Sequence, residues 1–170
     1  MGKVAAVWGL LGVCALLLHA VLRLSPRAAE AVTTGLTPVQ WAILIGWVGF
    51  MAYSEGYRGF HLRFSPMVVA RARWLAQHPT AIRLLLAPAF CMGLFHATRK
   101  RLIISWSLIA GIALLVVVVS LLPAPWRGIV DAGVVVGLFL GLTSIGYHAV
   151  RALLGTPPSV SEDLPREVAA

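Results

Sequence analysis

Long uncharged runs of apolar residues dominate the sequence, and short stretches that hold most of the charges separate them. Four runs are long enough to cross a hydrocarbon core about 30 Å thick, which takes about 20 helical residues. They predict membrane-spanning helices at about residues 4–22, 36–58, 102–122 and 128–150. The sequence therefore predicts an all-α integral membrane protein, a four-span helical bundle formed by a single domain over residues 1–154.

A fifth apolar run, residues 84–98, lies between the second and third predicted spans. It is short for a span and contains Pro88 and Gly93, so we expect a re-entrant or interfacial segment. Before it, residues 66–78 mix large apolar side chains with arginines such as Arg71, which predicts a cytoplasmic amphipathic helix in the headgroup layer.

The two ends of the chain raise separate questions. Residues 155–170 hold prolines and acids but few large apolar residues, so we expect a flexible, solvated cytoplasmic tail. At the other end, Lys3, the first apolar run and Ala29-Glu30-Ala31 loosely resemble a cleavable signal peptide. That run is long for a signal peptide, and Arg23 and Arg27 crowd the region before the site, so we expect the first helix to be retained.

Composition supports the membrane assignment and bears on the partners. The chain is 59% hydrophobic and 12% charged, whereas soluble domains average about 25% charged residues. Its net charge of +8 would suggest nucleic acid in a soluble protein. In a membrane protein, basic residues gather in cytoplasmic loops and meet anionic lipid headgroups there. We therefore expect the lipid bilayer and its anionic headgroups as partners and no nucleic acid.

The distribution of the basic residues predicts the orientation. With four spans and the N-terminus inside, eleven of the fourteen lysines and arginines lie on the inner side. If residues 84–98 also crossed, the split would become seven against seven. The positive-inside rule therefore favours four spans in a bacterial-type inner membrane, with both termini cytoplasmic.

Glu55 is the one acid in the cytoplasmic half of any predicted span. A carboxylate near hydrocarbon needs a partner or a proton. Arg58 follows three residues later on the same helix face. One interpretation is a structural pair that anchors the helix end, and the other is an acid that carries a proton or binds a headgroup.

Three histidines, His61, His96 and His148, are expected near the same cytoplasmic face as Glu55. If the chain is an enzyme, these four residues are the candidates for acid/base catalysis. None shows a metal-ligand spacing, so we expect no metal site. His19 lies at the opposite end of its span from His148, which disfavours a bis-histidine haem, and no cofactor is expected.

Two further patterns concern binding surfaces. Five basic residues are either topology anchors or a site for lipid headgroups or phosphorylated ligands: Arg58, Arg63, Arg99, Lys100 and Arg101. In the fourth span, Gly133, Gly137 and Gly141 repeat every four residues, and such a groove lets another helix approach closely. That helix belongs either to the same chain or to a partner or second copy.

The preferred function from the sequence is an accessory, assembly or interaction subunit that docks to another membrane protein through helix contacts. The alternative is a membrane enzyme or binding protein that acts on a lipid headgroup or a phosphorylated ligand at the cytoplasmic face. A third possibility is an oligomeric transporter or channel, which ranks last because the spans carry few polar groups near the bilayer midplane.

Overall fold

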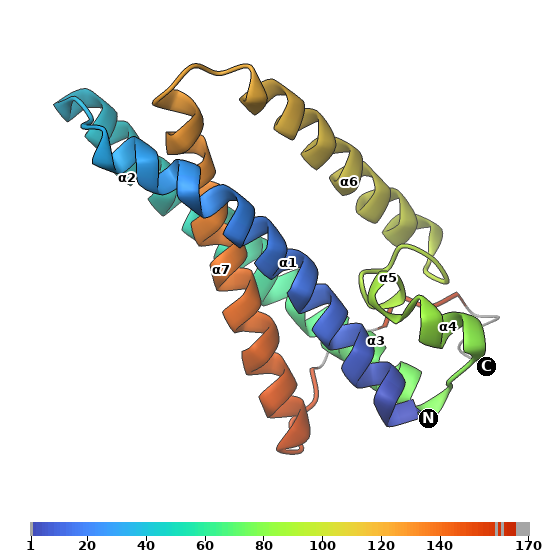
Figure 1. The fold of residues 1–170 in the computed structure, drawn as a ribbon. Coiled ribbons are helices and arrows are strands. Elements are labelled where there is room, and N and C mark those ends of the chain that lie inside the picture. Colours follow the sequence, from blue (N-terminus) through green and yellow to red (C-terminus); the bar gives the residue numbers. More distant parts are fainter. Residues whose placement is uncertain (1, 159, 161, 166–170) are drawn as a thin grey trace.

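All regular elements of the described chain are helices (Figure 1). The computed structural model describes residues 2–158, 160 and 162–165. Its elements are α1 (Gly2–Thr33), α2 (Pro38–Met51), the π-helix η1 (Ala52–Phe64), α3 (Ser65–Gln77), α4 (Ala81–Leu85), α5 (Ala87–Cys91), α6 (Arg99–Ser120) and α7 (Trp126–Leu153).

Three helices, α1, α6 and α7, are long and apolar enough to cross a membrane. They overlap the first, third and fourth spans predicted from the sequence, although α1 continues well past the predicted end at residue 22 to Thr33. The all-helical class is confirmed for the described residues. The second predicted span is divided, because α2 has only 14 residues before η1 begins.

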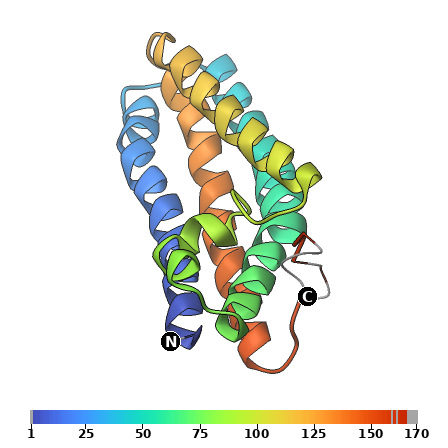
Figure 2. The ribbon, with the colours of Figure 1, turned by 90° about the vertical axis from the view of Figure 1, so that its right-hand side faces the viewer.

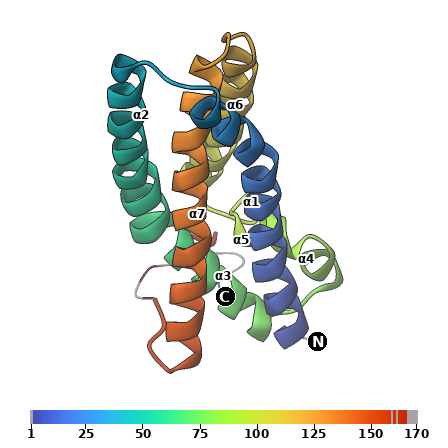
Figure 3. The same ribbon diagram turned by 60° about the vertical axis from the view of Figure 1, so that its left-hand side comes forward.

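α2, η1 and α3 form one continuous helix over residues 38–77. Thr37 begins it with a capping box, in which its hydroxyl accepts from the Gln40 amide and the Gln40 side chain accepts from the Thr37 amide. The two junctions, Ala52 and Ser65, both have right-handed helical angles, so the direction is not broken. Figure 3 shows this long helix running beside α7.

The segment expected to be a surface helix, residues 66–78, is instead part of the core. Every residue from Ser65 to Ala72 in α3 is buried, and so is Leu75. Pro66 lies where η1 passes into α3, and the helix continues through it although its nitrogen has no proton to donate. The amphipathic interpretation placed Arg71 on a polar face, but its side chain points inward and is satisfied there.

α7 lies at the centre of the bundle, against α1 on one side and the long helix on the other (Figure 3). The main core joins α1, α3, α5 and α7, with Val13, Val68, Phe90 and Ile145 among its fully enclosed side chains. Gly12 permits the approach of α5, since a Cβ there would overlap the ring of Pro88. This core lies toward the end of the bundle that holds the N-terminus.

The predicted interfacial run 84–98 forms no long helix. Its first part holds the end of α4 and all of α5, each five residues long. Residues 92–98 then lead into α6 without a regular helix.

The described C-terminal residues differ from the expected solvated tail. The Asp163 carbonyl accepts from the Thr98 amide at 2.8 Å, and Leu164 packs against the core; residues 166–170 lie outside the described part.

α6 stands apart from the other helices (Figure 1). Of its residues only Ser105 and Val119 are buried. Its first turns are fastened by two hydrogen bonds, from Ser105 Oγ to the Met92 carbonyl at 3.3 Å and from Trp106 Nε1 to the Leu94 carbonyl at 3.2 Å. Its remaining length presents apolar side chains outward.

Candidate functional site

The glycine stripe of α7 is occupied by the chain's own long helix. A Cβ on Gly141 would lie 2.7 Å from the Phe60 ring, and one on Gly133 would overlap the indole of Trp47. That indole donates to the Val130 carbonyl at 3.2 Å. The spacing of the glycines therefore serves close packing inside the chain.

Glu55 faces the middle of this stripe. A Cβ on Gly137 would lie 2.8 Å from Glu55 Oε2. That oxygen is buried and has no hydrogen-bond partner among the described residues. Arg58, its expected partner, is exposed. The carboxyl group is thus held between two helices by packing.

About two turns of α7 beyond Gly137, η1 brings His61 against Ser144. His61 Nδ1 lies 3.0 Å from Ser144 Oγ. His148 Nε2 lies 3.1 Å from the His61 carbonyl, so that nitrogen carries the proton and donates, which leaves Nδ1 free. The two imidazole rings are 5.0 Å apart. The structure thus joins two of the three predicted histidines.

Aromatic rings flank His61 on both sides. The ring of Tyr57 is 5.7 Å away and that of Tyr147 is 5.6 Å away, between centroids. Arg151 Nη1 lies 3.3 Å from the Tyr147 hydroxyl, and its guanidinium lies 5.7 Å from the Tyr147 ring centroid. A cation is therefore held beside the histidine pair.

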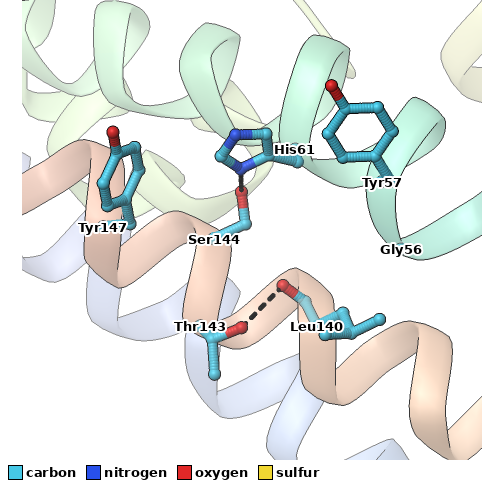
Figure 4. A pocket seen from close by; sticks show the side chains of 7 residues that line it. All are labelled: Gly56, Tyr57, His61, Leu140, Thr143, Ser144 and Tyr147. Carbon is cyan, nitrogen blue, oxygen red and sulfur yellow. Dashed lines mark hydrogen bonds between the residues drawn. The ribbon is translucent and has the colours of Figure 1, made fainter. Parts of the chain in front are cut away.

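Two cavities share His61 in their walls. The first, of about 350 Å³, lies between η1 and α7 and is lined by Gly56, Tyr57, His61, Leu140, Thr143, Ser144 and Tyr147 (Figure 4). The second, of about 260 Å³, lies toward the C-terminal segment and is lined by His61, Leu62, Pro66, His148, Arg151, Thr156, Pro157, Pro158 and Val160.

The other predicted residues do not join this site. Glu55 meets α7 at Gly137, seven residues before Ser144, which separates them by about 10 Å along a helix that rises 1.5 Å per residue. His96 lies in the loop before α6 with a positive φ of 45°. Among the described residues, no group of three or more histidine, cysteine or acidic side chains could hold a metal ion.

The basic residues predicted to bind headgroups are spread over the surface. Arg58, Arg63, Arg99 and Lys100 are exposed, and Arg101 is half-buried. None of the five lines either cavity beside His61. The cation that does is Arg151, which the sequence analysis did not single out. It could have been found, because Ser144, His148 and Arg151 share one face of α7 at spacings of four and three residues.

Arg71 is a second polar centre that the sequence did not reveal. Its guanidinium donates to the carbonyls of Phe90 at 2.6 Å, Glu162 at 2.8 Å, and Phe95 and His96 at 3.0 Å each. Its carbon lies 4.2 Å from the centroid of the Phe90 ring. Burial lowers the pKa of Arg71 to about 10, so the group is still charged at neutral pH. It fastens three segments that are remote in the sequence.

No known protein family matches the chain, and neither a curated protein nor a solved structure does.

Proposed function

We propose that this chain is a non-enzymatic accessory or assembly subunit that docks onto another membrane protein through α6. The observation that supports this proposal is the isolation of α6 from the rest of the bundle. The glycine stripe of α7 is already filled by the long helix, so it does not supply the docking surface. Of the three long apolar helices in the described chain, α6 has the smallest buried share, so most of its surface is available for docking.

The exposed face of α6 carries a small-residue notch among bulky side chains. Ser107 and Gly111 are exposed and four residues apart, and a Cβ on Gly111 would meet nothing within 4 Å. Such a small-xxx-small pair lets a second helix approach closely enough for van der Waals packing, and Ser107 adds a hydroxyl for an interhelical hydrogen bond.

The partner's chemistry follows from the two ends of this face. The notch suits a membrane helix with small or β-branched residues at the same depth. Arg99 and Lys100 are exposed at the start of α6, so the partner is expected to carry acidic residues just outside the membrane on that side. These charges orient the encounter, whereas the notch supplies the packing.

The proposal includes a four-span arrangement in a bacterial-type inner membrane, with both termini cytoplasmic. The long helix would cross as the second span, beginning at α2 and leaving the membrane within η1. Two observations support an even number of crossings. The N-terminus and the described C-terminal residues lie toward one end of the bundle, and the α1–α2 and α6–α7 connections lie at the other (Figure 2).

The docking experiment compares two isoleucine substitutions on α6. The full chain is purified from native membranes in gentle detergent after brief cross-linking, and co-purifying membrane proteins are quantified. Gly111→Ile fills the notch and is expected to reduce a stoichiometric partner by about tenfold, the effect of about 1.4 kcal/mol of lost packing. Ala113→Ile changes an exposed small residue on another face of α6 and is expected to retain the partner.

The proposal fails if the unmodified chain yields no stoichiometric membrane partner, or if both substitutions reduce the partner equally. Recovery of a homo-oligomer that Gly111→Ile disrupts would instead assign the α6 face to a second copy of this chain.

A further inference from the structure

We propose that the two cavities around His61 form a binding site for a phosphate-bearing amphiphile, namely an anionic membrane phospholipid. The phosphate would lie in the cavity beside His148 and Arg151, and an acyl chain would lie in the cavity beside Leu140. The inference is independent of docking through α6, because the cavities are lined by residues of η1, α3, α7 and the C-terminal segment.

The polar cavity is suited to an anion by its charge. Its lining includes His61, His148 and Arg151, and none of the described residues that line it is an aspartate or glutamate. A guanidinium and imidazole N–H groups are the usual protein partners of phosphate oxygens. Arg151 is exposed, and its contact with the Tyr147 hydroxyl aligns the guanidinium without neutralising its charge.

His61 presents one ring nitrogen that has no partner among the described residues. His61 Nδ1 is engaged by the Ser144 hydroxyl, so its Nε2 is available. When Ser144 donates, Nε2 carries the proton and becomes a donor. His148 donates from Nε2 to the His61 carbonyl, which fixes the orientation of its ring in the wall of the polar cavity.

The neighbouring cavity has the chemistry of an acyl chain site. Leu140, Tyr57 and Gly56 supply apolar surface, and the Thr143 hydroxyl is turned back to the Leu140 carbonyl at 2.9 Å (Figure 4). Because α7 is one of the helices long and apolar enough to cross a membrane, this cavity faces the layer in which lipid chains lie. The pairing of a cationic and an apolar cavity around one side chain matches an amphiphile better than a soluble phosphate.

Lipid binding is tested by native mass spectrometry of the full chain in detergent. The protein is titrated with phosphatidylglycerol or with phosphatidylcholine of the same chains, and bound lipid is counted. Phosphatidylglycerol is expected to bind preferentially, and Arg151→Gln to weaken it about tenfold, the loss of one charge-assisted hydrogen bond. Arg99→Gln removes an exposed charge outside both cavities and is expected to leave binding within a factor of two.

A second pair of variants tests the acyl cavity. Thr143→Trp fills it and is expected to reduce phosphatidylglycerol binding at least fivefold, whereas Val150→Trp, at an exposed position of α7 outside both cavities, does not. Inorganic phosphate is added as a competitor. Competition at millimolar phosphate, together with no effect of Thr143→Trp, would overturn the lipid assignment in favour of a soluble phosphorylated ligand.

Equal losses from Arg151→Gln and Arg99→Gln would show nonspecific attraction to a basic surface and overturn the site, as would equal binding of the two lipids. Every substituted side chain is exposed in the structure, so the helices are expected to stay intact in each variant. Circular dichroism of each variant checks this.

Discussion

A buried arginine decides much of the local structure at the residue scale. Arg71 has no exposed surface, yet backbone carbonyls from two different segments accept its hydrogen bonds. A buried charge is tolerated when its donors are satisfied. A lysine at this position would keep the charge but lose the planar geometry that reaches four carbonyls at once.

We predict that Arg71→Lys lowers the free energy of unfolding by about 2 kcal/mol, since charge-assisted hydrogen bonds are lost and buried carbonyls are left unpaired. Unfolding by SDS in mixed micelles measures the change. Arg73→Lys is the matched control, because Arg73 is exposed two residues later on the same helix. An equal effect of the two substitutions would contradict a structural role for Arg71.

The burial of the Cys91 thiol can be tested by measuring how its rate of chemical labelling depends on pH. It is fully buried, and burial raises its pKa to about 12. Since only the thiolate reacts with maleimide, we predict very slow labelling at pH 8 and faster labelling as the pH rises toward 12. The Cys14→Ser variant isolates this thiol for mass spectrometry. Rapid labelling of the folded protein at pH 8 would show that α5 does not cover it.

For these individual residues, the sequence indicated which side chains to consider but did not predict their contacts. The sequence singled out Glu55 and His61, and the structure places both on η1 against α7, but their separation depends on how α7 meets η1. Arg71 was assigned to a water-facing surface because its carbonyl acceptors lie 19 to 91 residues away along the chain. A short-range pattern of apolar and polar residues cannot predict acceptors that are so distant in the sequence.

At the scale of elements, the long helix changes its winding where the polar residues begin. η1 runs for 13 residues, whereas π-helices are mostly single turns that occur at functional sites. A wider winding alters which side chains share a face, and it is η1 that sets His61 against Ser144. The apolar runs predicted α1, α6 and α7, but a π-helix has no distinct hydrophobic period that would reveal it in the sequence.

Packing along the glycine stripe leads to a prediction for α7. Gly141→Ala places a methyl group against the Phe60 ring, and overpacking of this kind costs about 1–3 kcal/mol. The better helix propensity of alanine offsets up to about 1 kcal/mol of that loss. We therefore expect a net decrease in unfolding free energy in mixed micelles.

Gly146→Ala is its control on the same helix, because a Cβ there meets nothing within 4 Å. It is expected to leave stability unchanged or slightly raised. If Gly141→Ala were equally neutral, the close contact between η1 and α7 would be wrong.

At the scale of the whole molecule, the proposed orientation depends on whether the long helix crosses the membrane. We predict that reporters inserted after residues 35 and 123 lie outside, and that reporters after residue 79 and at the C-terminus lie inside, because basic residues are retained on the inner side. Alkaline phosphatase and green fluorescent protein fusions distinguish the two sides. Residues 35 and 79 on the same side would show that the long helix does not cross.

The hydrogen bonds from Arg71 to backbone carbonyls also bear on the order in which the protein folds during synthesis. One of its four acceptors, the Glu162 carbonyl, follows Arg71 by 91 residues in the sequence, whereas the other three follow it by 19 to 25. Because synthesis proceeds from the N-terminus and chains generally fold as they emerge, the three nearer carbonyls are available to the guanidinium first. The polar core around Arg71 is therefore completed only after residue 162 has been synthesised.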